Sequence, residues 1–405
     1  MITAITAAAV LSSTIALAEP TLREDLSVTL DAMASSALAA DREAYLKHVW
    51  DGEKTLHQEQ WAWAKDLDRI APDVLKFELV GEPEIVGGEA HADIKIMWNT
   101  ENWESHDRTI NVPVRFIEDD GRWLYAGRQW AELKGDGVRV LYADGLGESA
   151  VRALDIWPEI KQKVEEGFKR TLDHPQVIKM YTSMPELQFS IFPAYVEPLG
   201  GWNEPMESIK LVGMNFSTGH LRAVLGHEYA HALTFSIPPE EIAVERAHAV
   251  PWWVHEGIAE LATQGFTPNR GRVQMAVEHW HRRGELQAWE DLTDFYTVDP
   301  AHYGQVYMQG RHMVSYVNDT FGTDARVEWI ESMMMGDSLE DASEQSLGKA
   351  WSEIDADWRT LVAEAVEERD RARAAEEAKQ KQEQETDQDS NQGTKKESAD
   401  PSKGD

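Results

Sequence analysis

Two short segments contain the residues whose types and spacing are suited to metal chemistry. The first is His227-Glu228-Tyr229-Ala230-His231, and the second is Glu256-Gly257-Ile258-Ala259-Glu260. Residues four apart on a helix lie one turn above each other on the same face, so the two histidines can bind one metal ion. The H-E-x-x-H spacing is typical of zinc hydrolases, in which zinc takes a third protein ligand and keeps a position open for water. Glu256 is the best candidate for the third ligand, with Glu228 leaning toward the open position.

The alternative is that the motif is a chance match. The run from Leu221 to Leu225 is apolar, so the histidines could merely border a core face. The helical context favours the metal site, because Ser217 or Thr218 can act as N-cap and no proline interrupts the run to Phe235. A second apparent helix opens after Pro251 and carries two carboxylates four residues apart. Apolar backs on both helices would turn the imidazoles and carboxylates toward each other.

The first motif, taken together with Trp253-Val254-His255-Glu256-Gly257-Ile258-Ala259-Glu260, resembles the gluzincin peptidases, especially the bacterial peptidase MA-like group. The resemblance covers roughly residues 137–322. It implies that Glu256 is a zinc ligand beside His227 and His231, and that Glu260 holds a ligand histidine from behind. Metzincins, another group of zinc peptidases, have a glycine and a third histidine soon after the first motif. This sequence has neither there.

A third segment fits the same family. Tyr307-Met308-Gln309-Gly310 resembles the Y-x-x-G pattern that precedes an apolar helix in gluzincins of the aminopeptidase and leukotriene-hydrolase type. The resemblance implies that Tyr307 donates a hydrogen bond to the developing oxyanion, with Glu228 as the general base. Tyr303, one turn earlier, and Tyr316 are the competing tyrosines, and the resemblance implies that Tyr316 takes the place of a buried aromatic residue. His255, next to the expected third ligand, is predicted to face the solvent.

The implied activity is zinc-dependent hydrolysis of a peptide or protein. Aminopeptidases of this family have a G-x-M-E-N strand whose glutamate captures the free amine. The corresponding stretch, Val212-Gly213-Met214-Asn215-Phe216, lacks that glutamate, which favours an endopeptidase. Two alternatives remain open: a catalytically idle extracytoplasmic binding protein, and a zinc hydrolase that acts on a non-peptide amide or an epoxide.

Composition excludes several classes of protein and site. The chain has 405 residues, 42% of them hydrophobic, which is enough for two or three domains. It has no cysteine, so disulfides and thiolate ligands are excluded. A net charge of −33 makes nucleic acid a poor partner, because binding to phosphates relies on lysine and arginine. No stretch is long and apolar enough to be expected to span a membrane.

The N-terminus predicts export. Met1 to Ala18 contains an apolar run and ends in Ala16-Leu17-Ala18, an A-x-A-type cleavage site before Glu19. Residues 1–18 are therefore expected to be a secretory signal, and the mature protein to be periplasmic or extracellular. An N-terminal helix of the mature protein is the alternative, since the usual positive charges are missing.

The expected fold class is α+β, with an N-terminal helix-plus-antiparallel-sheet cone domain and then a mostly helical zincin domain with a small edge sheet. In residues 19–135, helical patterns over 22–40 and 41–67 precede strands with period-two alternation. Asp119-Asp120-Gly121 predicts a turn between the last two strands. This region resembles the cystatin-like cone domains of the nuclear-transport-factor-2 type. The side chains predicted to point inward are Phe77, Leu79, Ile94, Ile96, Trp98, Ile110, Val112, Val114 and Phe116.

Residues 137–360 are expected to form the gluzincin peptidase domain, with strands over 138–142, 177–182 and 208–215 and a helix over 148–171. The resemblance implies that the last of these strands forms the sheet edge beside the active site, where an extended substrate could pair with it. Residues 364–405 are expected to form a charged, solvated helix to Ala378, followed by a disordered tail.

Overall fold

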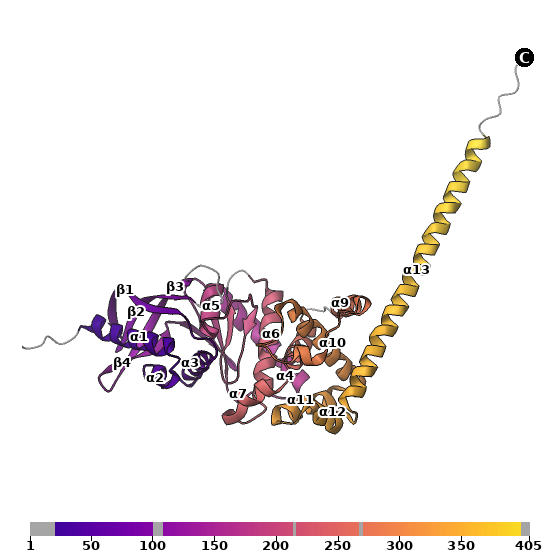
Figure 1. The fold of residues 1–405 in the computed structure, drawn as a ribbon. Coiled ribbons are helices and arrows are strands. Elements are labelled where there is room, and N and C mark those ends of the chain that lie inside the picture. Colours follow the sequence, from indigo (N-terminus) through magenta and orange to yellow (C-terminus); the bar gives the residue numbers. More distant parts are fainter. Residues whose placement is uncertain (1–20, 100–107, 214–215, 267–269, 398–405) are drawn as a thin grey trace, which may run out of the picture. The chain divides into compact units, whose positions relative to one another are not determined.

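The computed structural model describes residues 21–99, 108–213, 216–266 and 270–397 (Figure 1). The chain forms two compact units, one of Met1–Ala131 with Tyr181–Pro198 and one of Glu132–Met180 with Leu199–Asp405. The first contains an antiparallel sheet and the second is mostly helical, in agreement with the expected α+β layout. The expected secretory signal, residues 1–18, lies outside the described residues.

The first unit packs helices on a four-stranded sheet. Its elements are α1 (Leu22–Leu38), α2 (Arg42–Leu46), α3 (Lys54–Asp66), β1 (Val74–Val86), β2 (Glu89–Asn99), β3 (Arg108–Asp119) and β4 (Arg122–Arg128). The strands pair antiparallel in the order β1-β2-β3-β4. The β3–β4 turn forms at Asp120 and Gly121, which both have positive φ. The alternating side chains predicted to point inward contribute to the core, with Leu79 only partly buried.

A later segment completes this unit. Helix α5 (Met184–Ile191) contributes to the same core although it follows the first strands of the second unit in sequence. The Trp63 indole donates to the carbonyl of Phe189 at 2.8 Å, and the Trp98 indole donates to the carbonyl of Pro193 at 3.0 Å. Buried Arg128 forms an ion pair with Glu186. Because of these long-range contacts, Tyr181–Pro198 belongs to the first unit. The two units are therefore not separated by a single boundary near residue 136.

The second unit contains a five-stranded sheet in the order β5-β6-β7-β9-β8. The strands are β5 (Ala131–Gly135), β6 (Val138–Tyr142), β7 (Gln176–Tyr181), β8 (Gly201–Trp202) and β9 (Ile209–Val212). The expected edge strand forms as β9, but the edge prediction is wrong for the described part of the sheet. Gly201 and Trp202 pair antiparallel with Leu211 and Lys210, so the two-residue strand β8 occupies the edge.

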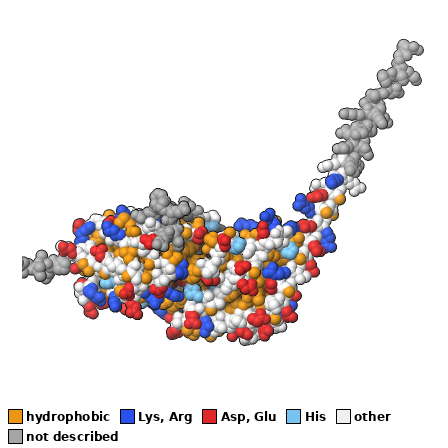
Figure 2. All heavy atoms as spheres, in the orientation of Figure 1, with side chains coloured by type: hydrophobic (Ala, Val, Ile, Leu, Met, Phe, Trp, Pro, Cys, Tyr) orange, Lys and Arg blue, Asp and Glu red, His pale blue; other side chains and the backbone are white. Residues whose placement is uncertain are grey.

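Helices make up the rest of this unit. They are α4 (Gly147–Phe168), α6 (Thr218–Phe235), α7 (Glu240–Ala249), α8 (Trp252–Ala262), α9 (Arg270–Arg283), α10 (Tyr303–Phe321), α11 (Thr323–Met335), α12 (Leu339–Leu347) and α13 (Trp351–Glu397), with short 3-10 turns η1 (Thr263–Gly265), η2 (Trp289–Leu292) and η3 (Pro300–His302). In the described residues, no helix is both long and apolar enough to cross a membrane. Figure 2 shows acidic side chains gathered over α11 and α12, in keeping with the negative net charge.

Helix α13 is longer than expected. Its buried side chains Ile354, Trp358, Val362 and Val366 recur every four residues, so they share one face. Beyond this face the described side chains from 371 onward are exposed. The helix nevertheless continues to Glu397, where the sequence predicted disorder from residue 379. Pairs four residues apart, such as Arg373 with Glu377 at 2.9 Å, and many good helix formers stabilise this solvated stretch.

Candidate metal centre

Local signals position the two motif helices. The Ser217 hydroxyl accepts a hydrogen bond from the backbone N–H of His220 and caps α6, as the sequence predicted. Pro251 precedes the first turn of α8, also as predicted. His227 and His231 lie one turn apart on α6, and Glu256 lies on α8. The two helices therefore bring the three predicted ligands together.

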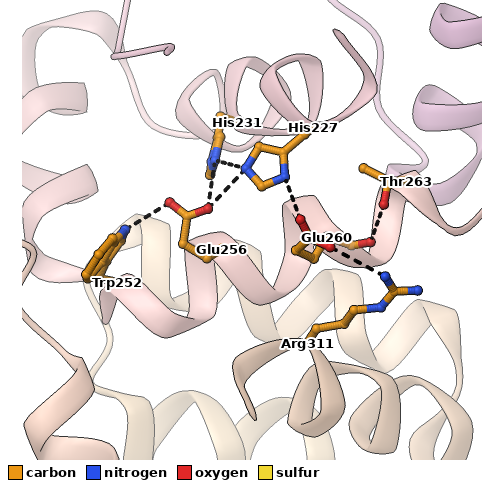
Figure 3. Close-up of polar contacts among 7 residues, drawn as sticks. All are labelled: His227, His231, Trp252, Glu256, Glu260, Thr263 and Arg311. Carbon is orange, nitrogen blue, oxygen red and sulfur yellow. Dashed lines mark hydrogen bonds and ion pairs between the residues drawn. The ribbon is translucent and has the colours of Figure 1, made fainter. Parts of the chain in front are cut away.

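The three side chains form a compact donor set (Figure 3). The Nε2 atoms of His227 and His231 are 3.1 Å apart. Glu256 Oε2 lies 3.0 Å from the first nitrogen and 3.6 Å from the second. Bonds of about 2.0–2.1 Å at a tetrahedral centre would place donors roughly 3.3 Å apart. Two imidazole nitrogens and one carboxylate oxygen at these separations fit zinc without rearrangement.

A second layer of side chains orients these donors. Glu260 Oε1 lies 3.5 Å from His227 Nδ1, which leaves Nε2 of the same ring to face the other ligands. Arg311 on α10 in turn reaches Glu260 Oε2 at 3.4 Å. The Trp252 indole donates to Glu256 Oε1 at 2.9 Å. The sequence analysis missed Arg311 and Trp252. For Arg311, the available signal was its position within a buried stretch of α10, one turn after Tyr307.

Burial and mutual charge shift the ionisation of the site. Burial alone would lower the pKa of His227, but hydrogen bonds to Glu256 and Glu260 outweigh it and raise that pKa well above its usual value. Burial works to raise the pKa of Glu256, yet the two histidines hold it far below its ordinary range. In the metal-free protein, these shifts favour the ionised form of Glu256 and the protonated form of His227. Any metal that binds must displace this proton.

Glu228 is buried and lies against the edge strand. A Cβ atom on Gly201 of β8 would be only 2.7 Å from Glu228 Oε1 and 2.9 Å from its Cδ. Burial raises the pKa of Glu228, and the neighbouring histidines only partly oppose this shift. A carboxylate with a raised pKa is better suited to accept and return a proton near neutral pH. The absence of a side chain at Gly201 provides the space for this carboxylate.

Tyr307, on α10, lies beside the predicted ligand His227. Its ring centroid is 6.1 Å from that of His227, with 28° between the ring planes. The competing Tyr303 packs edge-on against Trp252, with ring centroids 5.2 Å apart. Of these two tyrosines, Tyr307 is the one in ring contact with His227, a predicted ligand.

The prediction that His255 faces the solvent is wrong. The ring is 7% exposed, and its Nε2 atom lies 2.9 Å from the carbonyl oxygen of Ala247. It also packs against Phe235, with ring centroids 5.4 Å apart. Burial lowers the pKa of His255 to about 4. The C-terminal end of α7 and the aromatic end of α6 cover this side chain, which the local sequence did not indicate.

Comparisons with known proteins give limited similarity. No protein-family model matches the chain. Phosphonoacetaldehyde hydrolase of Bacillus cereus (strain B4264) is 26% identical over 119 residues, which are 27% of this chain and 44% of that protein. A second Bacillus cereus protein of the same name is 25% identical over 119 residues. The chain thus spans less than half the length of these curated relatives.

Two solved structures show similarity at low TM-scores. The M1 zinc metallopeptidase from Deinococcus radiodurans, in a mutant form, is 13% identical, covers 72% of this chain and 62% of its own, and has a TM-score of 0.34. Rv3472, a function unknown protein from Mycobacterium tuberculosis, is 14% identical, covers 32% of this chain and 82% of its own, and has a TM-score of 0.22. At these TM-scores, neither carries weight for the function of this chain.

Proposed function

We propose that this chain is a zinc-dependent peptidase of gluzincin type. The observation that supports it best is the buried set of His227 Nε2, His231 Nε2 and Glu256 Oε2 at separations suited to one tetrahedral ion. A structural zinc site would be closed by a fourth protein ligand. Among the described residues, the group that can hold a metal has these three members. This set of three supports a proposed site whose fourth position is taken by water.

The residues around the donor set have roles in peptide hydrolysis. Zinc held by the three ligands would lower the pKa of a bound water toward ~7. Glu228 accepts the proton of the attacking water and passes it to the leaving amine. Tyr307 donates a hydrogen bond to the oxyanion that forms at the scissile carbonyl. Glu260, backed by Arg311, keeps the His227 ring in the ligating orientation.

Endopeptidase action is the more specific part of the proposal. It rests on the lack of an amine-capturing glutamate in the stretch 212–216, of which residues 214 and 215 lie outside the described residues. The substrate would be an extended peptide or protein. Export is proposed from the sequence alone, and N-terminal sequencing of protein from an exporting host should find Glu19 first. An intact Met1 end confined to the cytosol would contradict export.

Metal analysis and a general protease assay test the function together. Purified protein should contain one zinc per chain and hydrolyse an unstructured protein such as casein, with activity lost to a chelator and restored by zinc. Glu256→Ala should purify without zinc and bind added zinc only weakly, through the two histidines. Full zinc content after this change would mean that another residue is the third ligand. Zinc binding without hydrolysis of any peptide would favour a binding protein, and cleavage of an amide or epoxide alone would favour a non-peptide hydrolase.

A further inference from the structure

The two carboxylate oxygens of Glu256 have different partners. Oε2 faces the two imidazole nitrogens, at 3.0 and 3.6 Å. Oε1 faces the other way and accepts the indole N–H of Trp252 at 2.9 Å (Figure 3). Both side chains are buried, with 9% of Trp252 and 7% of Glu256 exposed. Because little water reaches this hydrogen bond, it is strong enough to fix the rotation of the carboxylate.

Aromatic contacts hold the indole in this orientation. The Trp252 ring meets Phe295, Tyr303 and Tyr307 at centroid distances of 5.0, 5.2 and 6.1 Å. All three meet it edge to face, with interplanar angles of 81° to 89°. Edge-to-face pairs are a favoured aromatic geometry. Three of them around one ring restrict its rotation, so the N–H is aimed at Glu256 before any metal arrives.

The neighbouring Trp253 makes different contacts from Trp252, although Trp253 is the tryptophan of the family pattern. Trp253, the first residue of the W-x-x-E pattern, is fully buried and packs against Trp289 and Trp351 at 4.3 and 5.4 Å. Within the described part of the chain, its indole Nε1 has no hydrogen-bond partner. Trp253 is thus a core residue, and Trp252 is the tryptophan that contacts the donor set.

We propose that Trp252 is a positioning residue that makes Glu256 a one-oxygen ligand, an inference that rests on the proposed zinc site. The indole has a single N–H and no acceptor, so it engages Oε1 and leaves Oε2 for the metal. A carboxylate released from this bond can offer both oxygens. The second oxygen would then compete for the position that an open zinc site keeps for water. Trp252 thereby keeps the fourth coordination position free for water and also strengthens metal binding.

Trp252→Phe tests this proposal, because it removes the N–H and keeps an aromatic ring. Zinc affinity of the purified full chain is measured by competition with a chromophoric chelator. The expected result is a dissociation constant about 10- to 100-fold weaker, the usual cost of removing an outer partner of a metal ligand. The visible spectrum of the cobalt(II) form is the second readout, since it reports coordination number. We expect its band positions and intensities to change in Trp252→Phe.

Trp253→Phe is the matched control. It makes the same chemical change at the adjacent position, where the indole N–H has no partner among the described residues. It should lower thermal stability, because it trims a buried cluster, yet leave zinc affinity and the cobalt spectrum as in the unmodified protein. Circular dichroism of each metal-free variant verifies folding. If both variants weaken zinc equally, Trp252 acts through general packing and the proposal is overturned.

A double variant tests whether Trp252 affects zinc binding through Glu256 or through general packing. In a Glu256→Ala background, Trp252→Phe should not weaken the residual zinc affinity any further, because the acceptor is gone. A full additional loss would contradict the proposal, even if the single variant folds poorly. The proposed function fails separately, when the unmodified chain binds no zinc. The Trp252 inference fails when zinc binds through Glu256 but Trp252→Phe retains both affinity and spectrum.

Discussion

Gly257 of α8 and Gly310 of α10 face each other where the two helices cross. A Cβ atom on Gly257 would lie 2.7 Å from the backbone carbon and oxygen of Gly310. A Cβ atom on Gly310 would lie 2.5 Å from the carbonyl oxygen of Trp253. Real side chains do not tolerate such distances, so only glycine permits this close approach. The crossing brings the first turns of α10, which carry Tyr307, beside helix α8, which carries Glu256.

Tyr307→Phe should abolish most activity without affecting the metal. The change removes one hydroxyl and almost no volume, so zinc content and stability should be unchanged. Turnover should fall about 100- to 1000-fold, the usual cost of removing one oxyanion donor. KM should change little, because this hydrogen bond matters mainly in the transition state. Steady-state kinetics on a chromogenic peptide measure both parameters.

Tyr303→Phe provides the comparison. Its ring packs on Trp252 and is one helical turn from Tyr307, so the variant should retain most of its turnover. The opposite result, with the large loss in Tyr303→Phe alone, would assign the oxyanion role to Tyr303.

The parts of this site that depend on local sequence were predictable, and those that depend on distant contacts were not. The Ser217 cap and the start of α8 after Pro251 follow from signals within a few residues. The edge strand β8 has only two residues and therefore no periodicity to detect. The hydrogen bond from Trp252 to Glu256 depends on side-chain orientations that Phe295 and α10 impose. Neither neighbour could be assigned to that position from the sequence.

Glu228→Gln should separate metal binding from chemistry. Glutamine fills the same space but cannot accept the proton of the attacking water. Hydrolysis should therefore fall by about 100- to 10,000-fold, the range expected for a general base. Zinc content, measured by atomic absorption, should stay at one per chain. Near-normal turnover in a zinc-loaded variant would remove Glu228 from the general-base role.

Gly201→Ala should disturb the Glu228 carboxylate from the side of strand β8. The new methyl group would fall 2.7 Å from Glu228 Oε1, so this flexible side chain must move. A displacement of this kind should lower turnover by roughly 10- to 100-fold while zinc remains bound. Gly200→Ala is the control, because its Cβ would meet only Val224 Cγ2, at 3.4 Å. Equal losses in both variants would indicate a general effect of altering the segment around β8.

His312 provides a pH-dependent test of the fold away from the metal ligands. Its Nδ1 accepts the Trp358 indole N–H at 2.8 Å, and its Nε2 lies 2.8 Å from Gln274 Oε1. Since an indole can only donate, Nδ1 must be unprotonated and Nε2–H donates to Gln274. Burial, helped by the charge of Arg270, lowers the pKa of His312 to about 4. The folded protein therefore holds this histidine neutral.

The lowered pKa predicts a loss of stability in acid. Between the unfolded pKa of about 6.5 and the folded value, the unfolded chain binds more protons, so the free energy of unfolding falls as pH falls. At about pH 5 the loss from His312 should be roughly 2 kcal/mol relative to neutral pH. His312→Asn keeps an acceptor for Trp358 but cannot titrate. Urea unfolding of the metal-free proteins should show a smaller loss between neutral pH and pH ~5 in the variant, by about that amount. His255, with its own lowered pKa, is present in both proteins and cancels in the comparison. Identical pH dependence of the two proteins would mean that His312 is already able to protonate in the folded state.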